Sequence, residues 1–192
     1  MKYIFTSDWH IAHKNILKFA EREGCQNLDE MHHKLITNYN AVADENTVGY
    51  FLGDIAFDYK IAKEVIGQLK GVRVLIRGNH DYKPGTMIKM GFHVCMEEAV
   101  IKRLGQYIKL SHYPYQPLPV PLWRQVLLRE KARKVRYLSK RPIDNGGWLL
   151  HGHTHSSEKI CNKMIHVGVD AWKMKPVTEQ QLESLIGKYK NT

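Results

Sequence analysis

Five short stretches of the sequence gather residue types that bind metal ions. They are Ser7-Asp8-Trp9-His10, Gly53-Asp54, Gly78-Asn79-His80-Asp81, Ser111-His112 and Gly152-His153-Thr154-His155. Aspartate is a hard anionic ligand that can bridge two cations, and imidazole suits Mn, Fe, Zn or Ni. Each stretch alone is an ordinary turn or polar segment. Together, in this order and each after an expected strand, they indicate a metal site.

The spacing within two stretches predicts side chains that point the same way. Asp8 and His10 are two residues apart, so in an extended chain both lie on one face, and His153 and His155 repeat that spacing. Glycine lets the backbone turn sharply and approach a bound phosphate. A glycine precedes a ligand position at Gly53, Gly78 and Gly152. The other histidines after the first helix are interpreted as surface, core or supporting residues: His32, His33, His93, His151 and His166.

The first half of the chain alternates apolar runs with helical patterns. The runs at 2–6, 48–52 and 72–76 are typical of buried strands, and helical spacing covers 13–23, 29–43 and 61–69. Gly71 is expected to cap the third helix. The order β-α-α-β-α-β implies parallel strands, and ligands bind beyond the carboxyl ends of such strands. We therefore expect the stretches to meet in one cleft.

The second half of the chain has a different pattern. Hairpins are expected from 99–103 and 107–110 around Gly105-Gln106, and from 160–161 and 164–167 around Asn162-Lys163. A further apolar run lies at 148–150, and Thr178 to Gln181 matches a capping box that opens a final helix. A parallel first half and an antiparallel second half predict a mixed α/β or α+β fold. Residues 1–192 are expected to form a single domain, with a basic insertion at about 114–147.

Composition narrows the class of protein. With 192 residues and 43% hydrophobic content, the chain can bury a full core. The three cysteines lie far apart, which disfavours a disulfide framework and fits a cytoplasmic location. No apolar run approaches membrane-spanning length, so no membrane partner is expected. The formal charge of +10 favours a polyanionic partner, although it also serves solubility.

The five stretches resemble the calcineurin-like metallophosphoesterase superfamily over nearly the whole chain. The similarity is greatest to its small stand-alone bacterial and phage members, which have a second histidine where this sequence has His13. The resemblance implies a four-layer sandwich of two mixed β-sheets flanked by helices. It implies two divalent cations, with Mn expected and Fe, Ni, Zn or Mg as alternatives. The implied ligands are Asp8, His10, Asp54 and His155 for one metal, and Asp54, Asn79, His112 and His153 for the other.

A phosphoesterase mechanism follows from such a site. Two cations about 3.5–4 Å apart lower the pKa of a bridging water, and the hydroxide attacks phosphorus in line. His80 adjoins a ligand without being one, so we expect it to be the general acid. Asp81 is expected either to orient the His80 ring or to serve as a turn or salt-bridge residue. His13 is expected either to contact phosphate or to begin the first helix.

The segment 124–141 is strongly basic and lies between the His112 and His153 motifs. It is interpreted as a substrate-facing insertion, with a solvated helix face as the alternative. Arg133, Lys134 and Arg136 are the residues expected to hold substrate. The expected substrates are phosphodiesters of nucleotide type. The alternatives are a nuclease or nucleic-acid end-processing phosphatase, a protein phosphatase and a non-catalytic scaffold, and the oligomeric state stays open.

Overall fold

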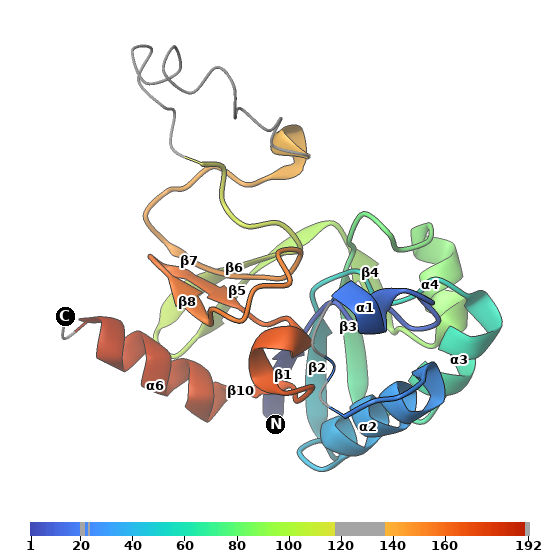
Figure 1. Ribbon diagram of the computed structural model, residues 1–192. Helices are drawn as coiled ribbons and strands as arrows, with labels where there is room; N and C mark the ends of the chain where they lie inside the picture. The colour runs from blue at the N-terminus through green and yellow to red at the C-terminus, as the bar shows by residue number, and fades with distance from the viewer. Residues whose placement is uncertain (20–21, 23, 118–136, 191–192) are drawn as a thin grey trace.

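The computed structural model describes residues 1–19, 22, 24–117 and 137–190. Two five-stranded sheets form the body of the molecule, with strand orders β10-β1-β2-β3-β4 and β5-β6-β7-β9-β8 (Figure 1). The strands of the first are β1 (Lys2–Thr6), β2 (Thr47–Phe51), β3 (Val72–Ile76), β4 (Val94–Met96) and β10 (Val177–Thr178). The strands of the second are β5 (Glu98–Arg103), β6 (Gln106–Ser111), β7 (Trp148–His151), β8 (Ile160–Cys161) and β9 (Met164–His166).

Helices pack on the first sheet because its strands are buried on both faces. The helices are α1 (Ile16–Phe19), α2 (Leu28–Asn40), α3 (Tyr59–Gly67) and α4 (Pro84–Met90). Side-chain caps fix where two of them begin: Asn27 accepts from Glu30 N, and Asp58 accepts from Ile61 N. Residues such as Leu35, Ile66 and Phe51 form one buried cluster between these helices and the sheet.

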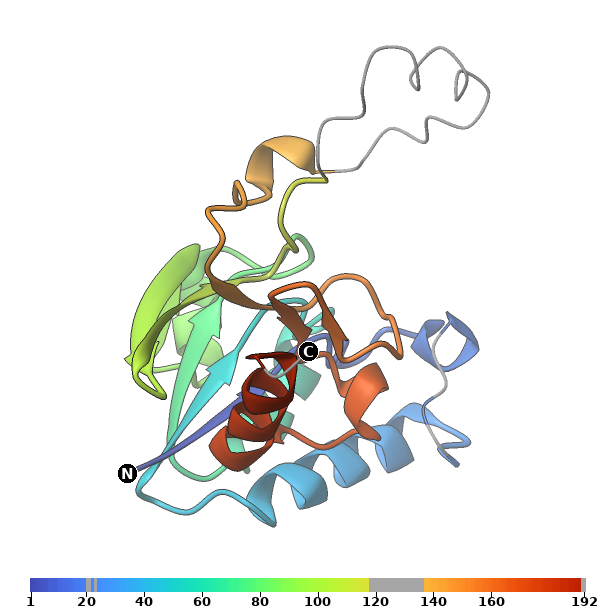
Figure 2. The ribbon, with the colours of Figure 1, turned by 90° about the vertical axis from the view of Figure 1, so that its left-hand side faces the viewer.

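A second apolar cluster lies between the two sheets. It joins Phe5, Leu52 and Ile76 of the first sheet region to Ile108 and Leu150 of the second. The last helix, α6 (Glu179–Lys190), adds Leu182 and Ile186 to the same cluster. Figure 2 shows the short 3₁₀ helix η1 (Leu138–Lys140), in gold, at the end of the molecule away from the N-terminus. None of the described helices combines the length and apolar character needed to cross a bilayer.

The expected mixture of two mixed sheets and helices is confirmed, with local corrections. The second half is not antiparallel throughout, because β6 pairs with β7, and β7 with β9, in parallel. The long connections before β7 and β9 return the chain to the end of the sheet where it started, which parallel pairing requires. In the first sheet, β10 joins β1 antiparallel, so that sheet is mixed as well.

Several element boundaries also differ from expectation. The helix expected over 13–23 is only the four-residue α1, and α4 and β4 were not anticipated. Gln68, not Gly71, caps α3, while Gly71 makes the following turn with φ +77°. The β5–β6 turn falls on Leu104-Gly105, both with positive φ, one residue earlier than expected. The β8–β9 hairpin and the Thr178 capping box are confirmed.

Candidate metal centre

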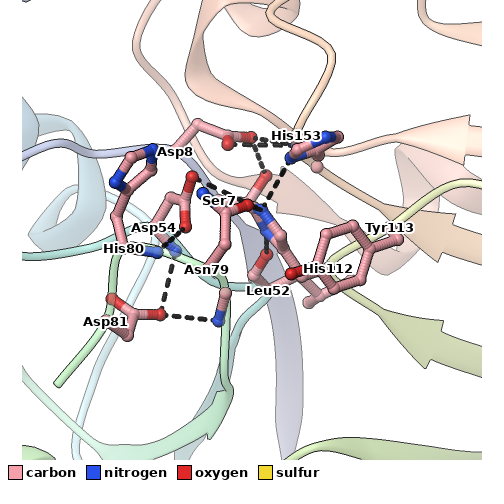
Figure 3. Close-up of polar contacts among 12 residues, drawn as sticks. Ser7, Asp8, Leu52, Asp54, Asn79, His80, Asp81, His112, Tyr113 and His153 are labelled. Carbon is pink, nitrogen blue, oxygen red and sulfur yellow. Dashed lines mark hydrogen bonds and ion pairs between the residues drawn. The ribbon is translucent and has the colours of Figure 1, made fainter. Parts of the chain in front are cut away.

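The five motif stretches meet at the carboxyl ends of strands from both sheets. Asp8 and His10 follow β1, Asp54 follows β2, and Asn79 follows β3. From the second sheet, His112 follows β6, and His153 and His155 follow β7. Figure 3 shows Asp8, Asp54, His112 and His153 pointing toward one another. Segments far apart in sequence therefore build one compact polar site.

Ligand-type atoms form two groups within the site. Asp8, His10 and His155 make one, and Asp54, His112 and His153 make the other, with the ligand atoms of each group within 4.8 Å of one another. Asp54 lies between them, because its Oδ2 is 3.4 Å from His112 Nε2 and 3.9 Å from His10 Nε2. We call the first group, with Asp54 shared, site 1, and the second group site 2.

Asn79 completes site 2. Its Oδ1 lies 3.3 Å from His112 Nε2, and His153 Nδ1 lies 3.2 Å from the same atom. The Nδ1 atom of His112 donates to Leu52 O at 2.8 Å, which turns Nε2 toward the site. All seven side chains expected as ligands are therefore brought together.

The ligand loops are not extended as expected. Asp8, His10, Asp54, His153 and His155 all have positive φ, between 50° and 72°. A non-glycine residue in this region carries strain, and such strain is concentrated at functional sites. His153 and His155 consequently reach different groups instead of one face. The strand order predicted correctly that the stretches meet, but the spacing did not predict the direction of each side chain.

Burial sets the charge of the histidines. It lowers the pKa of His10 to about 3 and that of His153 to about 4, so both rings are neutral and keep a lone pair for a metal. Burial also opposes a charged His112, but the hydrogen bond and charge of Asp54 outweigh it and raise the pKa of His112 to about 9. The same contacts with His112 lower the pKa of Asp54 although burial opposes this.

The donor set fits a pair of divalent cations. Both ring nitrogens of His10 are buried and have no hydrogen-bond partner among the described residues, and a metal ion would give one of them a partner. Carboxylates of Asp8 and Asp54 alternate with imidazole rings, of which His10 and His153 are neutral, and this combination of donors suits transition metals. The residues of both groups could therefore hold a metal ion each.

The glycines of the motifs pack the ligands against one another. A Cβ at Gly53 would lie 2.5 Å from His112 Nδ1, and one at Gly152 would lie 2.5 Å from Asp8 Oδ2. A Cβ at Gly78 would lie 2.2 Å from Asp54 Oδ1. The neighbouring ligand-type side chains therefore require glycine here, and the close approach of a phosphate to these glycines stays a prediction.

His80 lies at the edge of the site. Its side chain is exposed, its ring centroid is 5.9 Å from that of His10 and 4.9 Å from that of Phe57, and its backbone N donates to Asp54 Oδ1 at 2.9 Å. The His13 ring stacks on the same Phe57 ring, and the centroids of the two rings are 4.4 Å apart. Both rings can therefore face a molecule bound at the metals.

Asp81 occupies a different position from the one expected for a residue orienting His80. Its carboxylate is buried and accepts from the backbone N atoms of Asp54 (2.9 Å), Ile55 (2.7 Å) and Gly78 (2.8 Å). Burial raises the pKa of Asp81, and these amides partly offset the rise. Asp81 therefore ties together the two loops that carry Asp54 and Asn79, which matches the turn-residue alternative.

Three further residues at the site carry no signal in the sequence. Asp170, in the 3₁₀ helix η2 (Val169–Trp172), accepts from His155 Nδ1 at 2.7 Å and lies 2.9 Å from Arg22 Nε. His166, which we took for an ordinary residue, has its Nε2 3.9 Å from Asp8 Oδ2. None belongs to a spaced motif, so only the fold reveals them.

Described residues beside and within the expected basic insertion, residues 114–147, lie next to His153. Arg133, Lys134 and Arg136 lie outside the described residues. Tyr113 and Tyr137 place their ring centroids 5.0 and 5.7 Å from that of His153. Gln116 N donates to Pro142 O at 2.9 Å, which joins the outgoing and returning chains.

A cavity of about 560 Å³ adjoins the ligand loop on this side. Its lining includes Tyr115, Arg141, Thr154, Ile160, Met164 and His166. Thr154 stands between the ligand-type residues His153 and His155, so one wall of the cavity is the ligand loop itself. The Nε atom of Arg141 is buried and has no hydrogen-bond partner among the described residues.

Comparison with known proteins agrees with the fold and the site. The calcineurin-like phosphoesterase family matches residues 1–168, and this chain belongs to that family. Together with the two ligand groups, membership makes it a metal-dependent phosphoesterase.

Relatives of similar length are known. The uncharacterized protein MJ1445 of Methanocaldococcus jannaschii is 30% identical, covering 98% of this chain and 93% of its own. The Gene 66 protein of Mycobacterium phage L5 is 30% identical, covering 88% and 86%. Among solved structures, the protein of unknown function AQ665 from Aquifex aeolicus has a TM-score of 0.69 at 26% identity, covering 96% of this chain and 98% of that one.

Proposed function

We propose that the protein hydrolyses phosphodiesters of nucleotide type, with a divalent cation in each of sites 1 and 2 and His80 as general acid. The position of Asp54 between the two groups is the observation that carries this proposal. When bound, two such ions supply Lewis acidity toward the phosphate and lower the pKa of an attacking water. Manganese suits the mixed carboxylate and imidazole donors, and Fe, Ni, Zn and Mg are the alternatives to be compared.

The chain's own residues hold the reacting groups. The Asp54 carboxylate uses Oδ1 to accept from His80 N and leaves Oδ2 toward both sites. Asp81 fixes the backbone of Asp54 and Gly78, so the shared ligand and the His80 loop move as one unit. This support holds His80 in a fixed position relative to Asp54, and catalysis by proximity and orientation requires such fixed positions.

His80 is the residue best placed to protonate the leaving oxygen. It belongs to neither ligand group, and its exposed ring lies against Phe57 beside His10. A general acid must reach the departing atom without being tied to a metal. His13, stacked on the same phenylalanine, is proposed to contact a phosphate oxygen.

The surroundings of the site favour an ester larger than a simple phosphate. The cavity beside the ligand loop offers Tyr115, Ile160 and Met164 as apolar walls, with Arg141, a partly exposed residue whose Nε is buried, as a cationic donor. Tyr113 and Tyr137 add aromatic faces next to His153. A sugar and base could fill this space, whereas a small monoester would leave it empty. The charge of +10 also favours nucleic-acid ends as a second substrate class.

The test is a substrate panel measured with each metal after chelation and reloading. Nucleotide phosphodiesters, a generic aryl diester and the matching monoesters should be compared with Mn, Mg, Ni, Zn and Fe. We expect nucleotide diesters to give the highest kcat/KM, with no turnover in excess chelator. Faster hydrolysis of monoesters would contradict the substrate class, and full activity in chelator would contradict the metal mechanism.

A further inference from the structure

A buried chain of polar contacts links three distant segments behind site 1. His155 Nδ1 donates to Asp170 Oδ2 at 2.7 Å, and Asp170 Oδ1 lies 2.9 Å from Arg22 Nε. Arg22 continues the chain, because its Nη2 donates to the backbone O of Asp8 at 2.7 Å. The Arg22 side chain is 0% exposed and that of Asp170 is 6% exposed. One carboxylate and one guanidinium therefore connect two of the residues of site 1.

The contact to His155 decides which of its nitrogens can bind a metal. A neutral imidazole has one N–H and one lone pair, and a carboxylate at Nδ1 holds the proton there. Nε2 is then left with the lone pair, available to the group formed by Asp8, His10 and His155. Carboxylates in this position orient the ring and raise its basicity as a ligand.

The backbone around Asp170 is anchored to the strand that leads into the site. Val169 N donates to Ser7 O at 3.2 Å, and Ser7 and Gly168 form a parallel bridge. Arg22 holds the carbonyl of Asp8, a residue whose φ of 59° needs outside support. The His155 ring and the Asp8 backbone are thus set by the same pair of charges.

We propose that Asp170 and Arg22 are positioning residues for site 1 alone. This proposal rests on the proposed metal-dependent function, and it assigns a part in metal binding to residues outside every motif. At site 2 the ring of His112 is oriented differently, because its Nδ1 donates to the backbone O of Leu52 instead of to a carboxylate. The two sites should therefore respond differently to the loss of Asp170.

A metal-binding experiment with one site removed separates this function from a purely structural ion pair. His112→Ala leaves site 1 intact, and His155→Ala leaves site 2 intact. Asp170→Asn is added to each, and Mn²⁺ affinity is measured by calorimetry with metal content checked by elemental analysis. We expect about 10–100-fold weaker Mn²⁺ binding in the His112→Ala background and unchanged binding in the His155→Ala background. Equal losses in both backgrounds, or in neither, would overturn the proposal.

Two further variants guard against misfolding. Arg22→Lys keeps a buried positive charge but replaces the planar fork, which reaches Asp170 through Nε and Asp8 O through Nη2, with a single ammonium group, so it should weaken site 1 selectively as well. Glu183→Gln makes the same carboxylate-to-amide change on an exposed residue of α6 and should bind both ions normally. If Asp170→Asn unfolds, as circular dichroism in chelator would reveal, an Arg22→Lys protein with two normal sites overturns the proposal. A wild-type chain that binds no second ion would contradict the proposed function instead.

Discussion

Asp54 uses its two carboxylate oxygens for different tasks. Oδ1 accepts from His80 N, and Oδ2 faces His112 and His10 in the two sites. An anionic carboxylate can serve two cations at once, whereas a neutral amide oxygen is a far poorer bridge. The charge of this one side chain is therefore central to both sites.

Asp54→Asn should lower kcat/KM by more than about 100-fold and reduce the content of both metals. The fold should survive, because asparagine has the same shape and still accepts from His80 N through its side-chain oxygen. Metal analysis, circular dichroism and steady-state kinetics measure these three effects. Normal metal content in the variant would contradict the bridging position.

His80→Gln should slow reactions according to the leaving group. General acid catalysis contributes about 10²–10⁴-fold when the leaving group is an alkoxide, and little when it is nitrophenolate, which leaves without a proton. The ratio of the two rates in wild type and variant is the measurement. The exposed His33 supplies a matched His→Gln control. Equal losses on both substrates would show that His80 has another task.

At the residue scale, the sequence predicted which residues come together better than it predicted their conformations. The seven ligand-type residues belong to the motifs that carry the family resemblance, and the structure brings them together, while their binding of metal stays a prediction. Their backbone conformations could not be predicted, because positive φ at five of them depends on neighbours such as Asp81 and Arg22. Asp170 was missed for the same reason, since a lone aspartate outside a motif gains meaning only through its contact with His155.

At the scale of elements, the capping box at the start of α6 helps to build the apolar cluster between the two sheets. Thr178 N donates to Gln181 Oε1 at 2.9 Å, and Gln181 N donates to Thr178 Oγ1 at 3.4 Å. This reciprocal cap begins the helix that places Leu182 and Ile186 in the cluster between the sheets. The cap lies far from the ligand residues, so stability and chemistry can be separated here.

Thr178→Ala should cost about 1 kcal/mol of stability and leave turnover unchanged. For a chain of this size, that loss lowers Tm by about 2–4 °C. Thermal unfolding at fixed metal concentration measures the shift, and Thr178→Ser should restore it. A large loss of activity at temperatures where the variant is folded would mean that α6 influences the site.

Strands were predictable where they are long and buried. The runs at Lys2–Thr6 and Val72–Ile76 match their predicted limits because β1 and β3 lie inside the sheet. Strand β4 has no prediction from the sequence because its apolar run, Val94-Cys95-Met96, is only three residues long. It lies at the edge of the sheet, with one exposed and two partly buried residues. The parallel pairing of β7 with β6 could not be predicted from the apolar run alone, because the direction of pairing depends on contacts between segments far apart in the sequence.

For the whole molecule, the charge of +10 makes a prediction about salt. A polynucleotide bound through about four phosphates should lose kcat/KM with a log–log slope near −3 against salt, because counterions are released on binding. A small diester that contacts the metals alone should give a slope near zero. Measuring both substrates between low and physiological salt tests whether the basic surface holds nucleic acid. Parallel slopes would assign the charge to solubility.

The place of β10 in the first sheet has a consequence for folding during synthesis. β10 pairs with β1 through Ile4↔Thr178 and Phe5↔Val177, so β1 receives this partner only after the other strands of the described residues have been synthesised. Until then one edge of β1 presents unpaired N–H and C=O groups, which can recruit strands from other chains. Strand β10 and helix α6 therefore cover the edge of β1 and protect it from pairing with other chains. Chains that end before Val177 should aggregate more than the full chain.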